Sequence, residues 1–267
     1  MLNPIDGEIF YVDKPKGITS FAVVKRIRAV LRTHLGTRQV KVGHAGTLDP
    51  LASGVLILCT GRATKRIDTL QAAEKEYIAD LQLGATTPSF DLETAIDATY
   101  PWQHITREQI QRVLQEQFTG SIEQAPPAFS ACKIDGKPAY KLARKGKDVE
   151  IRPKTLVIKE IEIVSCELPA LRIRVVCSKG TYIRALARDI GVALGSGAHL
   201  TDLRRTRIGD ISVDTCLSPD ALVQRLDSET YVTPEEAEAQ RLEQERIENR
   251  RRAAQEKAKI HNQKSIK

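Results

Sequence analysis

The chain has 267 residues, of which 41% are hydrophobic and 28% are charged, and its formal net charge is +7. Such a length and composition fit a globular protein with one large domain or a domain with an appendage. No apolar run approaches the roughly 20 residues of a membrane span, and the first residues lack a secretory signal, so we expect a cytoplasmic protein. The positive charge favours a polyanionic partner.

The cysteines and histidines argue against a disulfide framework and against a metal site. The five cysteines form no C-x-x-C pair and their number is odd, while the five histidines are scattered without the spacing of metal ligands. We therefore expect reduced cysteines in the core and no bound metal.

The first elements of the chain are recognisable from their apolar periodicity. Residues 19–31 repeat apolar side chains every three or four positions, with basic residues on the other face, which predicts an amphipathic helix. The continuous apolar run of residues 55–59 is typical of a central strand, and the alternation in residues 77–83 predicts another strand. Thr106 and Gln109 fit a capping box at the start of a second helix.

The later elements complete a mixed order. Gly120 is expected to end the second helix, and residues 155–164 and 171–177 predict two further strands. Gly180 and Thr181 then open another helix. Because helices and strands do not alternate regularly, we favour an α+β fold.

Residues 126–154 are strongly basic, with eight Lys or Arg against three acids. Composition leaves two interpretations open. The segment is either a solvated excursion or a basic flap that lies on a phosphate backbone.

The last part of the chain loses the apolar pattern. Thr233, Pro234 and Glu236 make a good helix start, acids come early and bases late, and few large apolar residues follow. We expect a solvent-exposed helix that frays into a basic disordered tail, with RNA contact as a secondary interpretation. This pattern divides the chain into a domain of residues 1–232 and a tail of residues 233–267.

The stretch GHAGTLDPLASGVLIL places Asp49 at the mouth of the expected central strand. An Asp followed by Pro often only caps a helix or starts a turn. Here, glycines at 43, 46 and 54 would let the backbone turn tightly and let a bulky ligand approach. A carboxylate in this position needs a cation in order to stay charged, and Arg184 is the best candidate.

Four ordered blocks carry a resemblance to a known family. GHAGTLDPLASGVL closely resembles the catalytic motif of the TruB family of tRNA pseudouridine synthases, and VDKPKGITSF, KEYIADLQLG and CSKGTYIRALARDIG agree in order. The resemblance runs from about Tyr11 to Arg205. It implies a pseudouridine synthase fold with a mixed, mainly antiparallel central sheet and flanking helices. It also implies isomerisation of the T-loop uridine of tRNA, position 55, to pseudouridine, without cofactor or metal.

The same resemblance assigns roles to matched residues. Asp49 matches the essential catalytic carboxylate, whether it attacks the sugar C1′, adds to the base or promotes a glycal intermediate. Tyr77 matches a tyrosine that stacks on the target base and is a candidate proton acceptor, and Arg184 matches the arginine that pairs with the Asp and holds it ionised. The positions that match the nucleotide pocket are His44, Tyr182 and Leu203. The lysines expected to contact phosphate or to steady the catalytic loop are Lys14, Lys133 and Lys179.

Two further features follow from the resemblance. The basic segment corresponds to a family insertion that clamps the T-loop, and the buried target uridine has to be flipped out before it can react. The sequence also departs from the family pattern: no small RNA-binding PUA domain is recognisable after about Tyr231, and TTPSFDLE lacks the glycine usual near its end.

Three other functions compete with this one. A non-catalytic RNA-binding or RNA-folding protein would explain the basic charge but would leave Asp49 without a role. A glycosidase-like or nuclease-like hydrolase would need a second carboxylate or metal-ligating acids. A guide-RNA-dependent relative shares the Asp loop, but PLASGVL and the missing PUA domain favour the protein-only branch. We expect a monomer that acts on the T-arm of tRNA without guide RNA, and a separate tRNA-folding activity stays open.

Overall fold

The computed structural model describes residues 1–130, 132–134, 137–139 and 151–264. Its main sheet has nine strands: β1 (Ile9–Lys14), β2 (Val42–Ala45), β3 (Ala52–Thr60), β4 (Lys75–Leu83), β7 (Gly120–Gln124), β10 (Lys154–Glu167), β11 (Ala170–Cys177), β12 (Ala198–Ile208) and β13 (Ile211–Ser212). The α-helices of the described residues are α1 (Ser20–Leu35), α2 (Ile67–Ala72), α3 (Arg107–Gln117), α5 (Ile183–Ala193), α6 (Pro219–Ser228) and α7 (Pro234–Lys264). Two separate two-stranded sheets pair β5 (Ala85–Thr86) with β6 (Ala98–Thr99) and β8 (Lys133–Ile134) with β9 (Lys137–Pro138).

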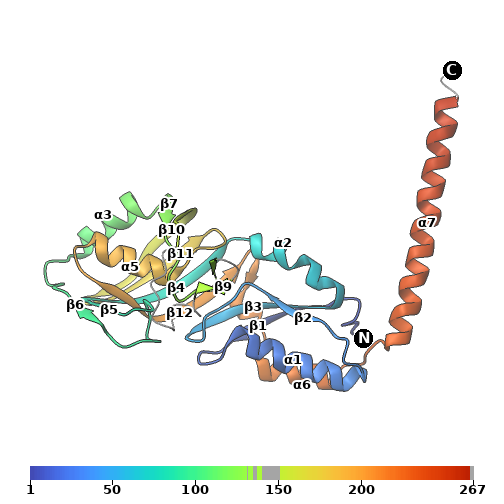
Figure 1. The fold of residues 1–267 in the computed structure, drawn as a ribbon, viewed down its shortest axis with the longest axis horizontal. Helices are drawn as coiled ribbons and strands as arrows, with labels where there is room; N and C mark the ends of the chain where they lie inside the picture. Colours follow the sequence, from blue (N-terminus) through green and yellow to red (C-terminus); the bar gives the residue numbers. More distant parts are fainter. Residues whose placement is uncertain (131, 135–136, 140–150, 265–267) are drawn as a thin grey trace.

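The main sheet is mixed and mostly antiparallel. Its strands follow the order β1-β3-β12-β4-β11-β10-β7, with β2 beside β3 and β13 beside β12. The pairing of β12 with β3 is parallel, and the other strand pairs of the described sheet are antiparallel. Helices α1 and α6 flank one end of the sheet, and α3 and α5 flank the other (Figure 1). The expected α+β fold is confirmed.

Residues 55–59 of strand β3 are all apolar because both faces of the strand are covered. Leu56 and Leu58 join the core formed with α1 and α6, whereas Val55, Ile57 and Cys59 join a second cluster. Each such buried aliphatic side chain contributes roughly 1.5–3 kcal/mol. The prediction of a central strand is confirmed, and all five cysteines are free.

The predicted starts of α1 and α3 are confirmed, whereas α5 begins at Ile183, just after the Gly180 and Thr181 that were expected to open it, and the predicted ends of α1 and α3 need adjustment. Thr19 caps α1 by accepting a hydrogen bond from the Ala22 amide at 3.0 Å, and the helix continues to Leu35, which is buried. Thr106 caps α3 through the Gln109 amide at 3.2 Å. This helix ends at Gln117, and Gly120, with a φ of 89°, opens β7 instead of closing the helix.

Helix α7 projects from the body (Figure 1). Its start is a reciprocal capping box: the Thr233 amide donates to Glu236 Oε2 at 2.9 Å, and the Glu236 amide donates to Thr233 Oγ1 at 3.2 Å. The predicted helix is present to Lys264, its side chains are mostly exposed as far as Gln255, where their description ends, and the last three residues of the predicted tail lie outside the described part. Among the described helices, none combines the length and the apolar character that crossing a bilayer requires.

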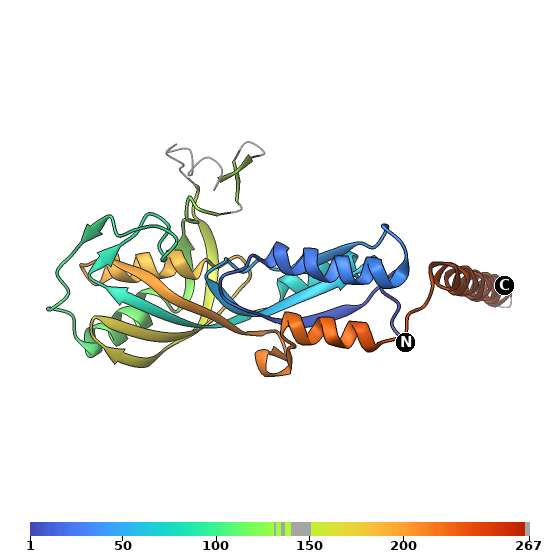
Figure 2. The ribbon, with the colours of Figure 1, turned by 90° about the horizontal axis from the view of Figure 1, so that it is seen from below.

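The basic segment of residues 126–154 is described only in part. Residues 131, 135–136 and 140–150 lie outside the described residues, so the flap stays a prediction there. The β8–β9 hairpin stands out from the body (Figure 2). Lys133 belongs to β8 by its backbone, and its side chain lies outside what is described.

Candidate active site

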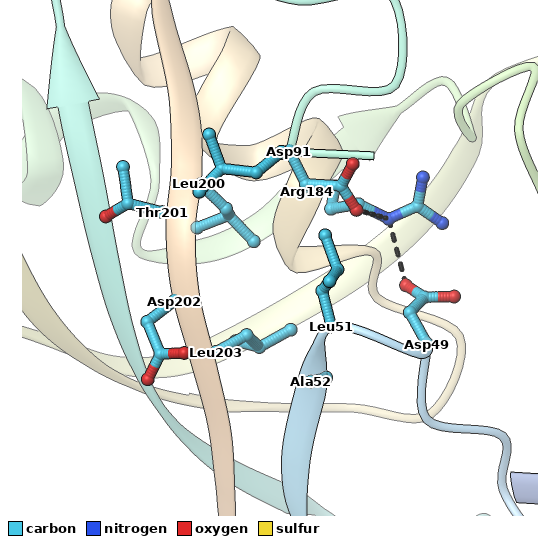
Figure 3. Close-up of a pocket in the computed structure, with 10 residues that line it drawn as sticks. Asp49, Leu51, Ala52, Asp91, Arg184, Leu200, Thr201, Asp202 and Leu203 are labelled. Atoms are coloured by element: carbon cyan, nitrogen blue, oxygen red, sulfur yellow. Dashed lines mark hydrogen bonds and ion pairs between the residues drawn. The ribbon is translucent and has the colours of Figure 1, made fainter. Parts of the chain in front are cut away.

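A pocket of about 270 Å³ lies where the loop before β3, the β5–β6 connection, α5 and β12 meet (Figure 3). Its lining combines carboxylates, one guanidinium and apolar side chains. The residues that line it are Asp49, Leu51, Ala52, Asp91, Leu92, Arg184, Leu200, Thr201, Asp202 and Leu203. A concave site with a few convergent polar groups in an apolar wall is the usual form of a small-ligand or active site.

Arg184 makes hydrogen bonds to several of the segments that surround this pocket. Its Nε donates to Asp49 Oδ2 at 2.9 Å and lies 3.7 Å from Asp91 Oδ2 (Figure 3). Its Nη1 and Nη2 donate to the backbone carbonyls of Ser89 at 3.0 Å and Phe129 at 2.9 Å. The residue is only 4% exposed, and a buried cation needs such partners because burial removes its hydration. One side chain thereby ties three separate segments together.

The pairing fixes Asp49 without burying it. The Asp49 side chain is 38% exposed, and its second carboxylate oxygen, Oδ1, accepts no hydrogen bond from the described residues. One oxygen is therefore held by a cation while the other is available to a ligand in the pocket.

Arg205 donates hydrogen bonds to backbone carbonyls on either side of Asp49 in the sequence. This residue of β12 is 2% exposed, and its guanidinium donates to the carbonyls of Val55 at 2.9 Å and Gly46 at 3.0 Å. Gly46 has a φ of 100°, in the left-handed region that favours glycine. At Gly54, with a φ of 107°, an added Cβ would lie 2.1 Å from the Arg205 carbonyl oxygen, so no side chain fits there. Gly54 thus permits close approach of β12, whereas the sequence suggested that the glycines would admit a ligand.

The start of α1 also holds the loop that carries Asp49. Ser20 Oγ donates to the Leu48 carbonyl at 2.9 Å and accepts from the Leu48 amide at 2.8 Å. Lys14 is fully buried, and its Nζ donates to the carbonyls of Pro15 and Ile18, both at 2.8 Å. These bonds hold the segment between β1 and α1, which in turn contacts the Asp49 loop where the Gly17 amide donates to the Pro50 carbonyl at 2.8 Å.

Burial lowers the pKa of Lys14 from 10.5 to about 8, against the opposing attraction of Asp49. The folded state therefore binds this proton less tightly than the unfolded state does, and the stability lost by burying the charge is recovered as pH rises from about 8 to 10.5. We expect the free energy of unfolding of the wild type to rise relative to that of Lys14→Met across this window. Urea denaturation of both proteins at several pH values measures the difference, in which the titrations of other groups cancel. Parallel curves would contradict the prediction.

Tyr77 and His44 lie beside the Asp49 loop. Tyr77 of β4 is 8% exposed and packs in the same cluster as Leu48 and Ala52, although it does not line the pocket. Burial raises the pKa of its phenol, so a proton-accepting role requires the substrate or Arg205 to offset this effect. Burial, together with Arg205, lowers the pKa of His44, and its buried Nδ1 has no hydrogen-bond partner among the described residues.

The remaining predicted residues are spread around the site. Tyr182 immediately precedes α5, where the buried Gln124 accepts from its amide at 2.9 Å and donates to its carbonyl at 3.2 Å. Burial raises the pKa of Tyr182 to about 12. Leu203 lines the pocket, whereas Lys179 is exposed just after the end of β11.

The structure thus brings together Asp49, Arg184 and Leu203 in one pocket, and it adds residues that the sequence did not single out. Asp91 and Arg205 are the main additions. Asp91 belongs to TTPSFDLE, a stretch that the family pattern already marks in the sequence. Arg205 belongs to a run of basic residues, and no local sequence pattern reveals that it is buried. Within the described part of the chain, no group of three or more His, Cys, Asp or Glu side chains is arranged to hold a metal ion.

Two models of known protein families match this chain. The model of the N-terminal domain of TruB family pseudouridylate synthases matches residues 32–183. The model of the C-terminal domain of tRNA pseudouridylate synthase B matches residues 184–244. The chain belongs to the TruB family of pseudouridylate synthases.

Individual relatives support the TruB assignment. A tRNA pseudouridine synthase B from Phocaeicola vulgatus is 64% identical over 228 residues, which cover 85% of this chain and 97% of the relative. The protein of the same name from Aromatoleum aromaticum is 46% identical, over 82% of this chain and 68% of the relative. A solved structure of an H/ACA RNP bound to a substrate RNA containing 2'-deoxyuridine is similar with a TM-score of 0.58 and 31% identity, over 83% of this chain. The chain spans about half (54%) of that solved chain.

Proposed function

We propose that this TruB family member isomerises a uridine of tRNA to pseudouridine, and that the uridine is the one at position 55 of the T-loop. The observation that carries the proposal is the pairing of Asp49 with Arg184 inside a small pocket. The name shared by its relatives, tRNA pseudouridine synthase B, supports tRNA as the substrate.

The proposed reaction consumes no co-reactant, because the product has the same atoms as the substrate. The bond between N1 of uracil and C1′ of ribose breaks, the base turns, and a bond forms between C5 and C1′. N1 gains a proton and C5 loses one, so the conversion is an isomerisation without redox change. Asp49 offers one carboxylate oxygen to the substrate while Arg184 holds the other. Attack on C1′, addition to the base and a glycal route are all compatible with this placement.

The pocket suits an extruded base. Leu51, Leu200 and Leu203 supply an apolar wall for a uracil that has left its stack, and exclusion of water strengthens the charge interactions of Asp49. We assign Tyr77 to stacking beside the target base, and His44 and Tyr182 to the walls of the nucleotide site. The unpaired Nδ1 of His44 supports this assignment because a buried polar atom usually has a partner, which RNA would supply.

The basic groups of the body are assigned to the RNA backbone. Lys179 is exposed near the start of α5, and with Lys133 it would contact phosphates, which position an RNA without reading its sequence. Residues 1–232 form the catalytic domain in this proposal, with residues 126–154 as the clamp on the T-loop and residues 233–267 as a separate tail. The enzyme would act as a monomer in the cytoplasm, without guide RNA.

The test is pseudouridine mapping on an unmodified tRNA transcript incubated with the purified protein alone, in the presence of a metal chelator. We expect stoichiometric conversion at the T-loop uridine and no other product. Released uracil or a cleaved strand would instead indicate a hydrolase, and binding without conversion would indicate an RNA-binding protein.

A further inference from the structure

Most of the net positive charge of this chain lies in the sequence of its last nineteen residues. Residues 249–267 hold seven Lys or Arg and one Glu, a net charge of +6, so residues 1–248 hold only +1 of the total of +7. Residues 234–248 hold six Glu and two Arg, a net charge of −4. Helix α7 is therefore acidic where it leaves the body and basic beyond that point.

The basic half of α7, which begins at Arg250, is exposed at its start. At 1.5 Å per residue the 31 residues of the helix span about 45 Å, and the helix points away from the rest of the molecule (Figure 1). Arg252 pairs with Glu248 at 3.0 Å, whereas no ion pair joins Arg250 or Arg251 to another described residue. These guanidinium groups are available to a partner outside the chain.

Neither the helix dipole nor an apolar surface accounts for the whole basic half. Bases at a helix C-terminus complement the helix dipole, but that effect fades within the last turn, and these bases begin about four turns before the helix ends. A helix that lies on a membrane or in a coiled coil needs an apolar face or seam. The only large apolar side chains in the sequence of α7 are Leu242, Ile247 and Ile260. A polyanion in water remains as the complementary partner.

The basic half lies apart from the pocket, so a partner that contacts both must be long. The side-chain contacts of α7 with the body lie, among the described residues, in its acidic half, from Gln240 to Asn3 at 3.5 Å and from Glu245 to Arg62 at 4.0 Å. None of the pocket residues belongs to α7. An RNA that touches both regions must therefore continue well beyond the nucleotide in the pocket. The family match ends at residue 244, so the basic half is an addition to the region that this chain shares with the family.

We propose that the basic half of α7 is a second RNA-binding element, which contacts the sugar–phosphate backbone of the substrate tRNA at a distance from the flipped uridine. This inference rests on the proposed function for the identity of the RNA. Contacts of this kind are independent of sequence, and each one adds to the salt dependence of binding because it releases condensed counterions.

The test compares Arg250→Gln/Arg251→Gln/Arg252→Gln with the wild type in tRNA binding at several salt concentrations. We expect the triple variant to bind full-length tRNA about tenfold more weakly near 0.1 M salt and to lower the magnitude of the salt slope by about 2. Binding of a stem-loop that contains only the T-arm should stay unchanged, as should turnover at saturating tRNA. The matched control is Arg241→Gln/Arg246→Gln, the same chemistry on the acidic half, for which we expect wild-type binding.

The alternative results are distinguishable. Equal affinity and equal salt slope for the triple variant and the wild type would overturn the proposal, as would an equal loss on tRNA and on the T-arm stem-loop, which indicates diffuse electrostatics. A chain that ends at Asn249 removes the basic half altogether and should weaken tRNA binding at least as much as the triple variant does, with circular dichroism to verify that the body is folded. Failure of the wild type to form pseudouridine would count against the proposed function alone, because the binding measurements do not depend on turnover.

Discussion

Asp49→Asn is expected to abolish pseudouridine formation, with a loss of about 10⁴-fold or more, while tRNA binding stays within about threefold of the wild type. The amide has nearly the shape of the carboxylate, and its oxygen can still accept the 2.9 Å hydrogen bond from Arg184 Nε. It has no negative charge, however, so it can neither attack carbon nor take up a proton at neutral pH. Single-turnover conversion with excess protein, together with filter binding, separates the two effects.

The matched control for this substitution is Asp68→Asn, which makes the same change at an exposed carboxylate on α2, away from the pocket. We expect wild-type conversion from it. An Asp49→Asn protein that converts the uridine at more than about a hundredth of the wild-type rate would overturn the assignment of Asp49 as the catalytic carboxylate.

Arg184→Lys should produce the next largest effect. An ammonium keeps the positive charge, but it cannot reach Asp49, the Ser89 carbonyl and the Phe129 carbonyl together as the guanidinium does. Breaking a buried ionic network costs about 3–5 kcal/mol, and misplacing a reacting group by about 1 Å costs about 10²-fold in rate. We therefore expect a fall in the free energy of unfolding and a fall of about 10²-fold in kcat. Urea denaturation and turnover at saturating tRNA measure these quantities.

Arg188→Lys, one turn further along α5, is the control for a general effect of shortening an arginine. The Arg188 guanidinium pairs with Asp189 at 2.7 Å and lies 4.9 Å from the centre of the Phe90 ring, so its loss should cost about 1 kcal/mol without an equal effect on kcat. If kcat of Arg184→Lys fell only in proportion to the unfolded fraction, Arg184 would have a purely structural role.

The sequence predicted the elements of the fold well wherever one periodic face decides the structure. The alternation that predicts β4 and the unbroken apolar run of β3 both appear as buried strands, because these patterns report directly how many faces are covered. Helix ends were less predictable. The apolar repeat of α1 fades after Leu31, yet Leu35 packs against the same core and extends the helix by one turn.

The candidate site was predictable only where a long motif carries several residues together. Asp49 and Arg184 were paired on this basis, and they meet at 2.9 Å although 135 residues separate them. Arg205 and Gln124 could not be found in this way, since each acts through backbone groups of distant segments, and no local pattern distinguishes a buried polar residue from an exposed one. The burial of Lys14 was hidden for the same reason.

The hydrogen bonds of the Arg205 guanidinium to the loop that carries Asp49 have a consequence for substrate choice. Because the charged Arg205 side chain donates hydrogen bonds to backbone carbonyls of this protein loop and of β3, the loop has one conformation before RNA binds. The entropy cost of ordering the loop is therefore met during folding and does not oppose RNA binding. Most of the conformational change on binding is then expected in the RNA, which must unstack and extrude a nucleotide. Among RNAs with the same T-loop sequence, differences in affinity for the protein should therefore follow how easily each RNA deforms. An RNA whose T-loop deforms more easily should bind more tightly, with no change in the protein.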